Sequence, residues 1–97
     1  MISRGNKTLI YGQWSSLAYH VYHAPLNFQN IKAEVDNLDT LLDNTKGIRE
    51  SINNALKIEL RKVKAASSKR DIYKVMNTFD ELATLLQINL HIKFDPQ

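Results

Sequence analysis

The sequence contains no cysteine, and this absence excludes several kinds of chemistry. Disulfide bridges, thiolate metal sites and cysteine nucleophiles all require that residue. A chain without disulfides fits a reducing compartment, so we expect a cytoplasmic location. Glycine is also scarce, and none of the three glycines lies in a phosphate-cradling loop motif. We therefore expect no cofactor.

Long apolar runs are missing as well. No stretch of the sequence approaches the roughly 20 apolar residues that a membrane-spanning helix needs. The segment Leu9–Ala24 is too polar for the core of a signal peptide, because it contains Gln13, two serines and two histidines. We expect no contact with a membrane.

No group of residues identifies an enzyme. Four serines offer hydroxyls, but the sequence places no base and orienting acid beside them. These serines are Ser15, Ser16, Ser67 and Ser68. Glu59 falls on the apolar side of its expected helix, where a carboxylate needs a partner. We interpret Glu59 as a paired structural residue and predict that the protein is not an enzyme.

Metal ligands are few and poorly spaced. Asp36, Asp39 and Asp43 recur at helical spacing, but the glycine turn and ligand order of a calcium loop are missing. His20 and His23 lie one helical turn apart, which leaves too few ligands for zinc. We expect no metal site.

What is present is the composition of a small folded domain. The chain has 97 residues, of which 43% are hydrophobic and 24% charged, close to the averages of globular proteins. A chain of this length forms one domain with its own core. We expect a single, mainly α domain over residues 1–97, a bundle of about four helices with a short C-terminal strand and a loose N-terminus over residues 1–7.

The chain is organised around one expected helix with two opposed faces, from Ile48 to Ala66. Its apolar face carries Ile48, Ile52, Ala55, Leu56, Leu60 and Val63. Its opposite face is basic and polar and carries Lys57, Arg61, Lys64, Asn53 and Asn54. The apolar face must be covered by other helices, which leaves the basic face for solvent or a partner.

A first helix is expected over Leu9–Ala24, because apolar residues recur there at helical spacing. Pro25 ends it, since the residue before a proline is pushed away from helical angles. Gly12 disfavours a helix by about 1 kcal/mol relative to alanine. The alternative is a short strand over Lys7–Tyr11 that turns at Gly12 into a shorter helix.

Two further helices complete the expected bundle. One begins after an N-cap at Asn27 or Asn30 and ends at Gly47, which supplies a left-handed conformation. The other begins at Ser68–Asp71, interpreted as a capping box, and buries the apolar stripe Ile72–Leu86. One continuous helix over residues 48–88 is the alternative to a break at Ser67 and Ser68.

The period changes after Gln87. Apolar residues then alternate with polar ones from Ile88 to Phe94, which predicts a half-buried strand over residues 88–94. A strand needs a partner for its backbone groups. The candidates are a strand around Lys7–Tyr11 and the same strand in a second copy of the protein.

The segment Thr78–Phe94 resembles the closing helix and strand of some helix-turn-helix antitoxins and repressors. The resemblance implies a tail that packs under DNA-binding helices or pairs across a dimer. It covers about a sixth of the chain. Upstream, the spacing from Gly47 to Ile52 is one residue short of the two-helix DNA-reading unit, so no functional residue is carried over.

Charge is unevenly distributed along the chain. Residues 57–74 contain seven cations and two acids, whereas residues 31–50 contain five acids and three cations. Two interpretations stay open: the basic block binds a partner, or it pairs within the fold with Asp36, Asp39 and Asp43.

Two candidate surfaces follow from these patterns. The first, for a partner or nucleic acid, contains Lys57, Arg61, Lys64, Lys69, Arg70, Lys74, Asn53 and Asn54. The second, a protein interface, contains Trp14, Tyr11, Tyr19, Tyr22 and His23. We expect a non-catalytic protein-interaction module, such as a regulator or inhibitor from a phage or other mobile element. A small DNA-binding regulator is the alternative, and a homodimer is compatible with either.

Overall fold

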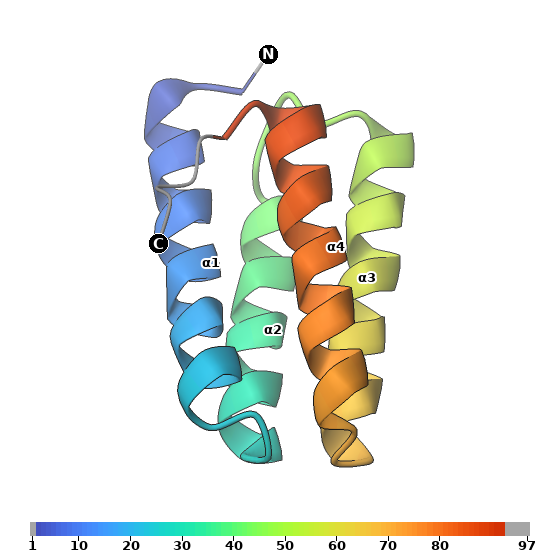
Figure 1. Cartoon of the computed structure of the whole chain (residues 1–97). Helices are drawn as coiled ribbons and strands as arrows, with labels where there is room; N and C mark the ends of the chain where they lie inside the picture. Colours follow the sequence, from blue (N-terminus) through green and yellow to red (C-terminus); the bar gives the residue numbers. More distant parts are fainter. Residues whose placement is uncertain (1, 93–97) are drawn as a thin grey trace.

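The computed structural model describes residues 2–92, which form an antiparallel bundle of four α-helices (Figure 1). The helices are α1 (Arg4–His23), α2 (Phe28–Asp43), α3 (Glu50–Ser68) and α4 (Ile72–Leu90). Short connections join them, so consecutive helices run in opposite directions. The prediction of a small, mainly helical bundle is confirmed.

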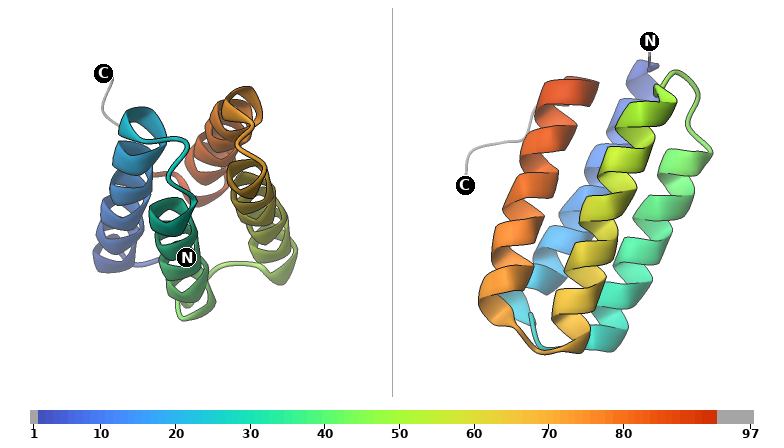
Figure 2. Two further views of the ribbon diagram at one scale, coloured as in Figure 1. Left: turned by 90° about the horizontal axis from the view of Figure 1, so that it is seen from below. Right: turned by 90° about the vertical axis from the view of Figure 1, so that its right-hand side faces the viewer.

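Each helix packs on its neighbours in the chain, and α1 also packs on α4 to close the bundle (Figure 2). The α1–α2 and α3–α4 connections lie at one end of the bundle, which we call the loop end (Figure 1). The α2–α3 connection and the last turn of α4 lie at the opposite end. The loop end is therefore built from segments far apart in the sequence.

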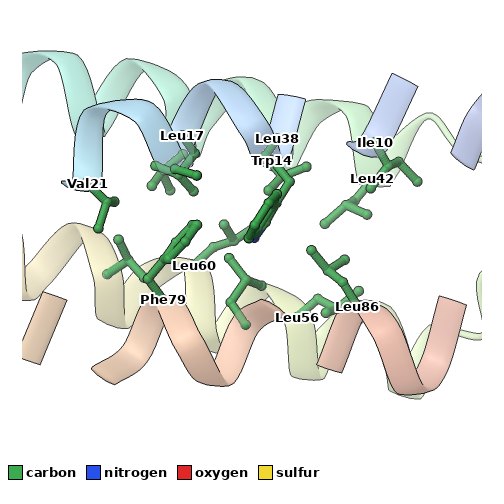
Figure 3. Packing of buried hydrophobic residues seen from close by; sticks show 14 of the residues in the cluster. Ile10, Trp14, Leu17, Val21, Leu38, Leu42, Leu56, Leu60, Phe79 and Leu86 are labelled. Atoms are coloured by element: carbon green, nitrogen blue, oxygen red, sulfur yellow. The ribbon is translucent and has the colours of Figure 1, made fainter. Parts of the chain in front are cut away.

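The core is made of one apolar stripe from each helix. Its fully buried large side chains are Ile10, Leu17, Val21, Ile31, Leu38, Leu42, Leu56, Leu60, Val63, Phe79, Leu82 and Leu86. The rings of Trp14 and Phe79 stack with their centroids 5.2 Å apart, so that α1 meets α4 through an aromatic pair (Figure 3). Trp14 is only 8% exposed and belongs to this core.

The N-terminal segment is helical, so the expectations of a loose start over residues 1–7 and of a strand over Lys7–Tyr11 are wrong for the described residues. The hydroxyl of Ser3 caps α1 by accepting the Asn6 N–H at 3.1 Å. A side-chain cap supplies one of the donors that a helix start leaves unpaired. Helix α1 continues through both Gly5 and Gly12, and an added Cβ at either position would meet open space.

The C-terminal strand is also wrong over residues 88–92, because α4 continues to Leu90. Leu86 and Leu90 lie four residues apart and are both buried, whereas Ile88 is 65% exposed. A spacing of four fits a strand and a helix equally, which explains the error. Residues 93 and 94 lie outside the described residues. The resemblance to antitoxin and repressor tails included a closing strand, and residues 88–92 do not form one.

The break between α3 and α4 is confirmed, but its capping differs from the prediction. Ser68 is the last residue of α3, and its hydroxyl donates to the Ala65 carbonyl at 2.7 Å. Asp71 is the N-cap of α4 and accepts the Lys74 N–H at 3.1 Å. Of the other predicted ends, Asn27 caps α2 as expected. The helix ends earlier than predicted, at Asp43 with Asn44 as its C-cap, and Gly47 with its left-handed φ of 94° lies in the α2–α3 connection.

Helix α3 ends in a Schellman motif that places an arginine where glycine is usual. The Asp71 N–H donates to the Ala66 carbonyl at 3.0 Å, and the Arg70 N–H donates to the Ser67 carbonyl at 3.1 Å. Arg70 consequently adopts a left-handed φ of 58°. This conformation costs a side-chain-bearing residue about 1–2 kcal/mol.

Replacing Arg70 by glycine should therefore stabilise the protein. We expect Arg70→Gly to raise the free energy of unfolding by about 0.5–1 kcal/mol, because the gain from relieved strain exceeds the entropy that glycine adds to the unfolded chain. Arg70→Ala removes the same guanidinium without relieving the strain and should bring no such gain. Urea denaturation of the three proteins checks this, and equal stability of the two variants would contradict it.

Candidate functional site

The basic face of α3 is partly matched within the fold by the acidic flank of α2. Lys57 lies 2.5 Å from Asp43 and 3.8 Å from Asp39. Lys64 lies 2.8 Å from Asp36. Of the two interpretations left open by the sequence, internal pairing therefore holds for Lys57 and Lys64.

The pairing between α2 and α3 also includes a side-chain amide, and it shifts the pKa values of Asp43 and Lys57. Asn53 donates from Nδ2 to Asp43 at 3.3 Å. Hydrogen bonds from Lys57 and then from Asn53 lower the pKa of Asp43 below its ordinary value. The hydrogen bond between Lys57 and Asp43 also raises the pKa of Lys57, because it stabilises the ammonium form.

The remaining members of the predicted basic surface lie apart from this seam. In the part of the chain that the structure describes, Arg61 has no ion pair and is exposed, as is Asn54. Lys69 and Arg70 lie in the α3–α4 connection, and Lys74 lies in the first turn of α4. These three cations belong to the loop end, so the predicted surface is divided between two places.

Glu59 is a buried carboxylate with a partner. It is 9% exposed, and its Oε1 accepts a hydrogen bond from Lys62 Nζ at 3.1 Å. This geometry agrees with the interpretation of Glu59 as a paired structural residue. The other carboxylate oxygen, Oε2, is buried without a hydrogen-bond partner among the described residues.

The loop end gathers most of the exposed apolar side chains. Eight large apolar residues are exposed among the described residues, and five of them belong to this end: Tyr19, Tyr22, Leu26, Ile72 and Tyr73. Tyr73 is the most exposed of these, at 84%. We call these five residues the loop-end surface. Figure 2 (left) shows the ribbon of this end of the bundle from below.

A hollow of about 840 Å³ lies at the same end. The α1–α2 connection and the start of α2 form one wall, and the end of α3 with the start of α4 forms the other. Leu26 and Ile72 contribute to both the loop-end surface and the lining, while Arg70 and His23 bring positive or ionisable groups to it. We call this space the loop-end hollow.

The predicted aromatic interface separates into a core part and a loop-end part. Trp14 is buried and Tyr11 packs beside it, with ring centroids 6.3 Å apart. Tyr19 and His23 contact each other at the exposed end of α1, with ring centroids 4.5 Å apart. Tyr22 lies edge-on to the buried ring of Phe79, and its pKa is raised by burial and by the charge of Asp80.

Sequence reasoning missed Leu26, Ile72 and Tyr73 as surface residues. Ile72 follows the apolar spacing of α4, but it is 42% exposed because α4 starts there and no neighbouring helix extends over it. Tyr73 lies outside the apolar stripe, and a large aromatic residue in that position is the signal that the sequence did offer.

No family model, curated protein or solved structure matches the chain. Over residues 2–92, none of the helices has the length and apolar character that a membrane crossing requires. The same residues contain no cluster of three or more potential metal-ligating side chains. The cytoplasmic location stays a prediction from the sequence.

The seam between α2 and α3 predicts a pH-dependent contribution to stability. Because the folded-state pKa of Asp43 lies below its ordinary value of 3.8, its contribution is present above that pH and is lost as pH falls through the lower folded value. The raised pKa of Lys57 sets the upper limit of the same window, since its contribution is lost only as pH rises through the folded value.

We therefore expect Asp43→Asn to destabilise the protein near pH 7, and the difference from the unmodified chain to disappear as pH falls through the lowered folded-state pKa of Asp43. About 1 M salt should also reduce the difference, because the pair is exposed to solvent. Urea denaturation across pH and salt measures this. A difference that stays constant with pH would show that Asp43 acts through something other than its charge.

Proposed function

We propose that the protein is a non-catalytic protein-binding module and that it binds its partner through the loop-end surface. The observation that carries this proposal is the presence of five exposed large apolar side chains at one end of the bundle, two of which, Leu26 and Ile72, line a hollow there. Exposed apolar surface that gathers in one region marks interaction sites in small proteins. A regulator or inhibitor would act by occupying a surface of its partner.

The residue types at this end support a protein partner. Tyrosine supplies a large contact area at low entropic cost and is enriched among the residues that dominate binding energy. Tyr19, Tyr22 and Tyr73 are each at least 47% exposed, so their rings are available without rearrangement of the core. Leu26 and Ile72 add apolar area between them.

The charge distribution on α1 adds a second line of support. From Thr8 to Ile31 the sequence has no aspartate, glutamate, lysine or arginine. Depletion of charged residues is the compositional mark of the centre of a protein interface. Tyr19, Tyr22 and Leu26 of the loop-end surface lie within this uncharged stretch.

Binding of nucleic acid is the second candidate, and it rests on Arg61, Lys69, Arg70 and Lys74. It has less support because Lys57 and Lys64 are already neutralised by aspartates of α2. Phosphates would have to displace these carboxylates or use the remaining cations alone. Binding of that kind would weaken steeply with salt, whereas an interface built on tyrosines would not.

A site-specific crosslink tests the proposed surface. A photoreactive phenylalanine analogue replaces Tyr73 in the full chain, and in a matched protein it replaces Ile58, which is 50% exposed on α3. We expect irradiation in host lysate to join position 73 to one or a few defined proteins, because that position lies inside the binding surface. Mass spectrometry of the joined products identifies the protein and the contacted peptide.

Nuclease treatment and variants at the same end are the controls. The crosslink should survive nuclease and disappear when Tyr22→Ala is added, while position 58 should give only background. Crosslinks of equal strength from both positions would contradict the proposal. A product that vanishes with nuclease would favour the nucleic-acid alternative.

A further inference from the structure

We infer that the loop-end hollow receives an acidic peptide segment of the partner, with a carboxylate near Arg70 and an apolar side chain against Leu26 and Ile72. The inference rests on the proposed function and adds the chemistry of the bound segment. It combines four observations: the shape of the hollow, the charges around it, the start of α2, and one buried hydroxyl.

The size and lining of the hollow suit part of a peptide. Its volume of about 840 Å³ lies within the roughly 300–1,000 Å³ of typical ligand pockets. Pro25, Leu26, Phe28 and Ile72 provide apolar lining, and no aspartate or glutamate is among the lining residues. The lining of the hollow thus combines apolar and polar side chains and contains no carboxylate that would repel an acid.

A cation, Arg70, is part of the lining of the hollow. Lys69 precedes it in the α3–α4 connection, whereas Lys74 lies in the first turn of α4 and lines a separate hollow. The adjacent carboxylate, Asp71, is occupied in capping α4 through the Lys74 N–H and is not part of the lining. Arginine is well suited to this role because its planar fork can hold a carboxylate with two hydrogen bonds.

The start of α2 adds backbone donors to this end. Phe28 and Gln29 are in the lining, and they are the first two residues of the helix. Asn27 satisfies the Asn30 N–H, whereas the Gln29 N–H has no recorded partner within residues 2–92. Helix N-termini attract anions, and the first turn of α2 contains no acidic side chain of its own.

A buried hydroxyl in the lining is the independent observation. Ser67 is 0% exposed, and its Oγ has no hydrogen-bond partner within the described residues. The hydroxyl of the next residue, Ser68, by contrast bonds to the Ala65 carbonyl. Buried polar groups in proteins are almost always paired. A ligand carboxylate or carbonyl in the hollow would accept the Ser67 O–H only after this side chain turns toward the hollow, because the Oγ is closed to solvent in this structure.

The combination of features favours a peptide over a nucleic acid. A phosphate backbone would use the cations but would leave Leu26, Phe28 and Ile72 without a role. A peptide with a glutamate or aspartate beside a leucine or aromatic residue would use both kinds of lining. Arg70 would then supply the partner contact from a backbone position where glycine would be less strained.

The experiment is an NMR titration of the isotopically labelled full chain, in which the amide chemical shifts are measured as each probe is added. The probes are the blocked peptides Ac-GEELYEEG-NH2, its lysine counterpart Ac-GKKLYKKG-NH2, and a short DNA duplex. We expect saturable shift changes from the acidic peptide, concentrated in residues 23–29 and 67–72. The lysine peptide and the duplex should leave these amides unchanged at moderate salt.

Variants then separate the contacts from the fold. Both Arg70→Ala and Arg70→Gly should lower the affinity for the acidic peptide by about tenfold, which is the loss expected when a charge-assisted hydrogen-bond pair is removed. Because the glycine variant is expected to be the more stable protein, its loss of binding would not reflect unfolding. Ser67→Ala should weaken binding severalfold, and Lys46→Ala, an exposed change at the opposite end, should leave it unchanged.

Three outcomes would overturn the inference. These are the absence of saturable shifts at the loop end with millimolar acidic peptide, equal binding of the lysine peptide, and the same shifts from the duplex. The proposed function fails separately, since its test is the protein crosslink from position 73. A retained crosslink with no preference for the acidic peptide would remove the inference alone.

Discussion

Burial of one apolar stripe from each helix is the constraint on which the rest of the structure depends. Complete burial of a large apolar side chain contributes about 1.5–3 kcal/mol, and no polar contact in this bundle matches the sum of those in the core. The stacked rings of Trp14 and Phe79 join α1 to α4 and so close the ring of helices. Each helix therefore has one fixed orientation, which decides what it leaves on the surface.

The arrangement of charge follows from that orientation. Packing of α2 against α3 brings the aspartates of one helix beside Lys57 and Lys64 of the other. Exposed ion pairs of this kind add little stability, but they reduce the positive potential of the α3 face. Charge segregation along the sequence is thus partly an internal match between neighbouring helices, because Lys57 and Lys64 pair with aspartates of α2. Lys69, Arg70 and Lys74 lie near the loop end, and Arg61 stays exposed on α3.

The short connections determine what the loop end exposes. A helix that starts at a tight turn has no neighbour over its first residues, so Ile72 and Tyr73 stay accessible although α4 is otherwise well packed. The same geometry leaves the hollow between the two connections and excludes hydrogen-bond partners for Ser67. The exposed apolar residues at this end are consequently available to a ligand.

The sequence predicted the helices well because their apolar residues repeat at helical spacing, as from Ile31 to Leu42 and from Val75 to Leu86. It failed at the chain ends, where Ser3 capping extends α1 and where the spacing of Leu86 and Leu90 fits two periods. The ion pairs and the hollow depend on how the helices pack in space, and the periodicity of a single helix does not predict that packing. Of the candidate site, Tyr19, Tyr22, His23 and Arg70 were therefore predicted as residues but not as one surface.

The most direct test of the account compares the loop end with the basic face of α3 on the same captured partner. Calorimetry would measure binding by the full chain, by Tyr22→Ala/Tyr73→Ala and by Arg61→Glu. The account predicts a loss of about tenfold or more for the tyrosine variant, since central aromatic residues dominate interface energies, and little change for Arg61→Glu. A strong loss of affinity with Arg61→Glu, together with unchanged binding by the tyrosine variant, would show that the partner binds the basic face of α3. That result would contradict the account.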